Sequence, residues 1–132
     1  IKEASGNIDQ IQQIIDRRPD GFLVLSGDDG MVLPVMQRGG DGVISVAANA
    51  FPARFMQCVN LAKAGDFAQA EAEFAALDEA VKALFAEGNP TGVKCALSVM
   101  GKIGPALRLP LVEGSADLRE RFRRLIAEYD LR

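Results

Sequence analysis

Short apolar runs alternate with helical stretches over the first 50 residues, and only helical stretches follow. The run Phe22 to Leu25 has turn residues on both sides, which predicts a strand buried on both faces. Val43 to Val46 predicts the next strand, and Ile1 with Lys2 predicts the end of an earlier one. Strands separated by helices favour an α/β fold with a parallel sheet.

The connecting stretches carry helix signals. Asn7 is a candidate cap for a helix whose face is formed by isoleucines, and Gln10, three residues on, fits a capping box; the face comprises Ile8, Ile11, Ile14 and Ile15. The segment Pro19-Asp20-Gly21 ends that helix. A second helix is expected over about 30–38, with Pro34 in its opening turn and Gly39-Gly40 at its end.

From residue 52 onward the pattern predicts helices without intervening strands. Helices are expected over about 52–64, 67–86 and 91–100, the second capped by Asp66. After a loop at 102–114, Ser115 caps a last helix with one apolar face, formed by Leu118, Phe122, Leu125, Ile126 and Tyr129. The apolar side of helix 67–86 is expected to face an intramolecular core, although a partner-binding helix is the alternative.

Composition and charge exclude several function classes. The chain has 48% hydrophobic and 25% charged residues, which is ordinary for a folded domain, and its net charge of −3 gives no attraction to nucleic acid. The spacing of Cys58 and Cys95 fits neither a metal site nor a disulfide, so both are predicted to be buried free thiols. Free thiols suit a reducing compartment, and a cytoplasmic location is therefore expected. No run has the length of a membrane span. The chain has no His, so no Ser-His or Cys-His pair exists within it.

Lys2 is the first candidate for chemistry. It ends a strand and precedes a turn and a helix, the position at which β/α barrels keep catalytic groups. A lysine attacks a carbonyl only when unprotonated, which requires a site that removes water or adds positive charge. Without further information, a lysine so near the start of a chain is more simply a solvated charge.

The turn Ser26-Gly27-Asp28-Asp29 is the second candidate. Gly27 lets backbone approach a ligand closely, or it simply forms a strand-to-helix turn with Asp28 or Asp29 as the cap. The paired carboxylates suit a metal ion poorly because no further acidic cluster lies near in sequence, so no metal is expected. They would also repel phosphate, and a small carboxylate ligand fits better.

Four segments, KEASGN, LSGDD, GGDGVISVAANAFP and NPTGVKCALS, resemble the carboxy-terminal portion of the dihydrodipicolinate synthase family of pyruvate-dependent Schiff-base lyases. The resemblance implies that Lys2 forms an imine with pyruvate and that Gly27 lines the pyruvate pocket. It implies that the main-chain carbonyl of Ile44 helps to orient the substrate. Aspartate semialdehyde is the implied second substrate, in lysine and diaminopimelate biosynthesis, with no cofactor and a homotetrameric assembly.

The implied fold is the carboxy-terminal part of a (β/α)8 TIM barrel over residues 1–51, followed over residues 52–132 by the final barrel helix and a helical domain. A complete barrel takes about 250 residues, so we expect a missing amino-terminal half that holds the catalytic tyrosines and the carboxylate-binding loop. Tyr129, the single tyrosine of this chain, does not match any of these catalytic tyrosines. The segment alone is expected to be inactive.

Two alternatives stay open at this point. The complete protein could be another pyruvate-dependent aldolase on the same barrel, such as an N-acetylneuraminate lyase, because the residues that select the second substrate lie outside this chain. The chain could also be an inert fragment whose helices only pack. The GVISV run with Asn49 and the SGDD turn favour the synthase.

Overall fold

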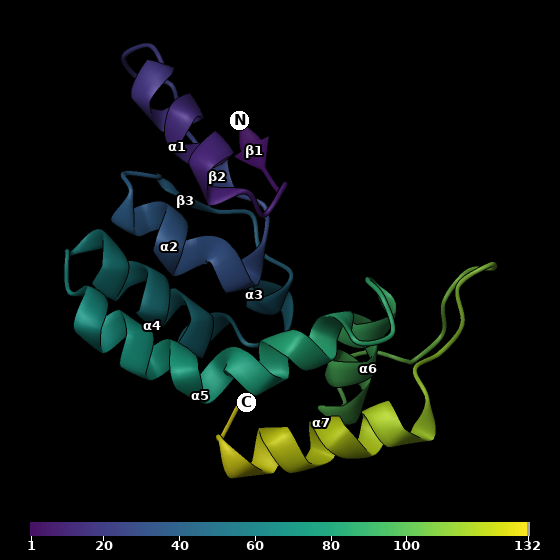
Figure 1. The fold of residues 1–132 in the computed structure, drawn as a ribbon. Coiled ribbons are helices and arrows are strands. Elements are labelled where there is room, and N and C mark those ends of the chain that lie inside the picture. Colours follow the sequence, from purple (N-terminus) through teal and green to yellow (C-terminus); the bar gives the residue numbers. More distant parts are fainter. Residues whose placement is uncertain (132) are drawn as a thin grey trace.

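A computed structural model describes residues 1–131. Strands and helices alternate up to residue 50, and every later element is a helix (Figure 1). The elements are β1 (Lys2–Glu3), α1 (Ile8–Arg17), β2 (Leu25–Ser26), the 3-10 turn η1 (Asp29–Met31), α2 (Val32–Gln37), β3 (Gly42–Val43), α3 (Ala47–Ala50), α4 (Pro52–Lys63), α5 (Phe67–Phe85), α6 (Thr91–Val99) and α7 (Ala116–Glu128). The predicted α/β organisation is confirmed.

The three strands form one parallel sheet in the order β1-β2-β3. Glu3 pairs with Ser26, and Ser26 pairs with Val43. Main-chain hydrogen bonds continue past the strands, because Gly27 N donates to Glu3 O at 2.6 Å and Ile44 N donates to Ser26 O at 2.9 Å. The carboxyl ends of all three strands therefore lie at one edge of the sheet.

The two faces of β2 differ in burial. Val24 and Ser26 are buried, whereas Leu23 on the other face is 55% exposed. Helix α2 packs against β2 and β3 on the buried face, and no element of residues 1–131 covers the other. Within residues 1–131 the strand is thus buried on one face only, and its burial on both faces stays a prediction for the complete protein.

The strand predicted over Val43 to Val46 ends at Val43, and the short helix α3 follows. The Asp29 carboxylate accepts hydrogen bonds from the Val46 and Ala47 amides, and Ser45 Oγ accepts one from Ala48 N at 2.8 Å. These bonds turn the chain into a helix despite its β-branched residues. Strand propensity is overridden here by side-chain acceptors distant in sequence.

The helix caps follow the sequence signals with one exception. Asn7 Oδ1 accepts hydrogen bonds from Asp9 N and Gln10 N, both at 3.1 Å. Asp66 caps α5 and Ser115 caps α7, as predicted. The Gln10 side chain, however, donates to Glu3 Oε1 at 3.1 Å. The capping box is thus half formed, because a buried carboxylate competes for the glutamine.

Helix α5 is the central element of the helical part. It packs against α4, α6 and α7 and also contacts α2 (Figure 1). Its buried residues Leu77 and Leu84 join one core with the other helices, which confirms the expected intramolecular core face.

Cys58 and Cys95 are free and buried in this core, and desolvation raises the pKa of both thiols. None of the helices in residues 1–131 is both long and apolar enough to span a bilayer.

The contact between α5 and α6 depends on Gly92. A Cβ atom at this position would lie 2.0 Å from Leu84 O, far inside van der Waals contact. The main chain of α6 therefore approaches α5 as closely as it does only because residue 92 has no side chain.

We predict that Gly92→Ala destabilises the protein by at least about 2 kcal/mol, since the helices must separate or bend. Thermal and denaturant unfolding measure the loss. Gly104→Ala is the matched control, because a Cβ there meets nothing within 4 Å. Equal stability of the two variants would contradict the close approach.

Candidate functional site

The ends of β1 and β2 bring Lys2 and Gly27 together. A Cβ atom on Gly27 would lie 2.8 Å from Lys2 Cε and 2.6 Å from the Cβ of Ala4. Gly27 therefore lies directly against the aliphatic part of the lysine. Absence of a side chain at residue 27 leaves space for the Lys2 side chain, which a sequence pattern alone does not reveal.

Ile44 follows β3 at the same level of the sheet. Because Ser26 pairs with Val43, the next residues along, Gly27 and Ile44, lie side by side. The Ile44 side chain is 50% exposed, on the uncovered face of the sheet. Lys2 is also exposed. The burial that we expect around its amine is thus not supplied by residues 1–131, because their helices cover only the opposite face.

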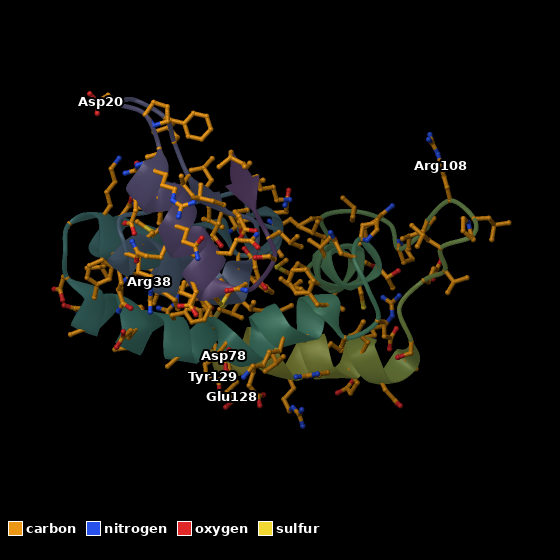
Figure 2. The ribbon with its side chains drawn as sticks, turned by 45° about the horizontal axis from the view of Figure 1, so that its top comes forward. Asp20, Arg38, Asp78, Arg108, Glu128 and Tyr129 are labelled. Carbon is orange, nitrogen blue, oxygen red and sulfur yellow. The ribbon has the colours of Figure 1, made fainter. Side chains whose placement is uncertain are left out.

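A groove with a volume of about 570 Å³ adjoins this edge. One wall is formed by Ala4, Gly27 and Asp28 after the strands, and the other by α5, including Val81, Lys82 and Phe85. The Lys82 ammonium lies 2.5 Å from the Asp78 carboxylate, and Asp78 is labelled on α5 in Figure 2. The groove therefore offers both charges beside an apolar surface. From the sequence, this helix was expected to pack in the core or, as the alternative, to bind a partner, and its place in a groove beside the strand ends was not predicted.

Two buried carboxylates support the strand ends from the covered face. Glu3 Oε1 accepts hydrogen bonds from Ser5 N and Gln10 Nε2, each at 3.1 Å. Asp29 is 1% exposed, and its Oδ2 accepts hydrogen bonds from two main-chain amides. The burial of these two carboxylates was not predicted from the sequence. The pattern of alternating strand faces does not indicate that a charged side chain will be buried.

Asp28 has the capping role that we allowed for either aspartate. Its Oδ1 accepts a hydrogen bond from Gly30 N at 2.8 Å, which opens η1. Asn49 makes turn contacts, since its Nδ2 donates to Ser45 O and Val46 O. Within residues 1–131, no three His, Cys, Asp or Glu side chains gather as metal ligands would.

Tyr129 lies apart from the strand ends. Figure 2 shows it at the end of α7, across α5 from β1. The Glu128 charge beside it raises the pKa of the Tyr129 hydroxyl. Its hydroxyl therefore stays protonated at neutral pH. Because of its position, Tyr129 lies outside the candidate site, as the sequence indicated.

Comparison with known proteins identifies the family. The model of the dihydrodipicolinate synthetase family matches residues 1–129. The chain belongs to this family. The 4-hydroxy-tetrahydrodipicolinate synthase of Phocaeicola vulgatus is 46% identical over all 132 residues, and that of Parabacteroides distasonis is 44% identical over the same length. This chain spans 44% of the length of each of these relatives.

Solved structures of dihydrodipicolinate synthases also resemble this chain. The enzyme from Aquifex aeolicus is 39% identical with a TM-score of 0.93, covering 98% of this chain and 44% of its own. The enzyme from Thermotoga maritima is 37% identical with a TM-score of 0.95, covering all of this chain and 46% of its own. A further structure, 38% identical with a TM-score of 0.95 over all of this chain and 45% of its own, is described as a monomeric dihydrodipicolinate synthase variant.

The contact between Gly27 and Lys2 gives a direct prediction. Gly27→Ala should displace the Lys2 side chain, because the new methyl group would overlap Lys2 Cε and Ala4 Cβ. If Lys2 of the complete protein forms the imine with pyruvate that the family resemblance implies, we expect the rate of its trapping by borohydride to fall at least about tenfold, which corresponds to about 1.4 kcal/mol. Gly104→Ala, remote from the sheet, should trap at the wild-type rate. Unchanged trapping in Gly27→Ala would show that this contact does not constrain the amine.

Proposed function

We propose that the complete protein is a 4-hydroxy-tetrahydrodipicolinate synthase that condenses pyruvate with aspartate semialdehyde through an imine on Lys2. The observation that carries the proposal is the contact of Lys2 with Gly27 at the carboxyl edge of a parallel sheet. It is supported by 46% identity, over the whole chain, to a protein of that name. The carboxyl edge of a parallel sheet is where α/β proteins keep their catalytic groups.

The proposal extends to the fold of the complete protein. Residues 1–51 would form the last strands and helices of a (β/α)8 barrel, and residues 52–132 the final barrel helix and a carboxy-terminal helical domain. The uncovered apolar face of the sheet, with Leu23 and Ile44, supports this, because strands of an amino-terminal half would cover it. The same strands would remove water from around Lys2 and so favour its neutral amine.

In the proposed reaction, Lys2 Nζ attacks the keto carbon of pyruvate, and water is lost to give the imine. The imine loses a proton from the pyruvate methyl group, and the resulting enamine attacks the aldehyde carbon of aspartate semialdehyde, whose oxygen takes up a proton. The amino group of the semialdehyde then attacks the imine carbon, which closes the ring and releases the Lys2 amine. Gly27 leaves room for the imine, and the Ile44 carbonyl orients the bound pyruvate. We place the tyrosine-based proton relay and the loop that holds the pyruvate carboxylate in the amino-terminal half.

We further propose a cytoplasmic homotetramer that acts in lysine and diaminopimelate biosynthesis. The two buried, unpaired cysteines support a reducing compartment. The resemblance to the family supports the tetramer. Because one structural relative is a monomeric variant, subunit association is separable from the fold, and the molar mass in solution measures it directly.

The first test concerns the amine itself. In the complete protein, borohydride with pyruvate should reduce the imine and leave a carboxyethyl group on the peptide that contains Lys2. Lys2→Arg should keep the fold and lose activity by at least about a thousandfold, because a guanidinium stays protonated. Lys63→Arg, at the end of α4, is the matched control and should react normally. A label on another lysine would remove Lys2 from its role.

The second test separates the synthase from other pyruvate-dependent aldolases. We expect condensation with aspartate semialdehyde to exceed cleavage of N-acetylneuraminate by at least about a hundredfold in kcat/KM. Steady-state rates with both substrates on the complete protein measure the ratio. Preferential cleavage of the sugar acid would mean that the complete protein is a lyase of this kind and not the synthase. The proposed imine on Lys2 would still stand.

A further inference from the structure

We propose that Asp29 is a positioning residue, which holds the main-chain carbonyl of Ile44 in place beside Gly27 and Lys2. The inference rests on the proposed function, in which that carbonyl orients pyruvate. Asp29 touches none of the reacting groups in this structure and acts through the main chain after β3.

The Asp29 carboxylate connects two strand ends. Its Oδ2 accepts hydrogen bonds from Val46 N and Ala47 N, both at 3.0 Å, across 17 and 18 residues of sequence. Asp29 itself follows Gly27 by two residues, and Ile44 precedes Val46 by two. One buried side chain thus joins the turn after β2 to the turn after β3.

These bonds bracket the peptide group that carries the Ile44 carbonyl. On one side, Ile44 N donates to Ser26 O at 2.9 Å. On the other, Val46 N donates to Asp29 Oδ2. Since each peptide is planar and each residue has only two soft dihedral angles, fixing two amides this close in sequence restricts rotation of the peptide between them. Loss of the carboxylate would release one end of the bracket.

The burial of Asp29 is costly, which argues for a positional role. The side chain is 1% exposed, and its Oδ1 accepts no hydrogen bond from residues 1–131. A carboxylate that is only partly satisfied stabilises a fold poorly compared with an apolar side chain of similar size. Its neighbour Asp28 is exposed and bonds only within its own turn, so it does not share the link to β3.

The experiment compares Asp29→Ala and Asp29→Asn in the complete protein. Asp29→Ala removes both hydrogen bonds, and we expect the KM for pyruvate to rise at least about tenfold, with faster hydrogen exchange at the Val46 and Ala47 amides. Asp29→Asn keeps one oxygen of the same shape, but a neutral amide accepts more weakly than a carboxylate. Its KM should rise about threefold, with a melting temperature near that of the wild type.

Asp66→Ala is the matched control, because Asp66 also accepts a main-chain hydrogen bond, from Gln69 N at 3.1 Å, but caps α5 far from the strand ends. It should lower the melting temperature and leave the KM for pyruvate unchanged. A comparable rise in KM for this variant would mean that general destabilisation explains the effect, and would overturn the assignment.

The outcomes separate this inference from the function on which it rests. If the wild type is labelled at Lys2 but Asp29→Ala keeps a normal KM, Asp29 is not a positioning residue and the function stands. Should Asp29→Ala not fold, a wild-type KM in Asp29→Asn overturns the inference equally. If pyruvate and borohydride leave Lys2 unlabelled in the wild type, the proposed function fails and the inference falls with it.

Discussion

The hydrogen bonds of the parallel ladder decide where every other part of the candidate site lies. They align the carboxyl ends of three strands that are separated by 21 and 15 residues in sequence, and they continue one residue past the strands to Gly27 and Ile44. Without this register, Lys2 would have no fixed neighbour. The strands themselves are short, so the bonds beyond their ends are a substantial part of the alignment.

Because side chains alternate along the strands, the candidate reactive group and the supporting carboxylates lie on opposite faces of the sheet. Lys2, Leu25 and Gly27 belong to the uncovered face, whereas Glu3 and Ser26 point toward the helices. The uncovered face thus carries the group proposed for chemistry, and the covered face carries the carboxylates that hold the turns. A residue on the covered face can affect the site without reaching it.

Local signals predicted most of the fold. Helix ends were predictable because proline, glycine and capping side chains such as Asp66 and Ser115 act within a few residues. Strand lengths were not, because Val43 to Val46 has strand propensity but is bent by the Asp29 carboxylate from another part of the chain. Residues 1–131 bury only one face of β2, and its burial on both faces stays a prediction for the complete protein, since an apolar run does not say which elements will cover it.

The candidate site, like the fold, was predictable from the sequence only in part. Lys2, Gly27 and Ile44 were singled out through a family resemblance, and the structure brings all three to one edge of the sheet. The α5 wall of the groove and the support from Glu3 and Asp29 could not be predicted, because they arise from contacts between elements distant in sequence. Such contacts leave no periodic trace in a single sequence.

Helix α5 couples the groove to the rest of the helical part. The same helix that supplies Val81, Lys82 and Phe85 to the groove is packed on its other sides against α4, α6 and α7. Because α5 moves as one rigid element, a change of side-chain volume in the core on one side of the helix shifts the groove wall on its other side. We therefore expect a substitution at a core position such as Leu77 to change the width of the groove while the side chains that line it stay the same.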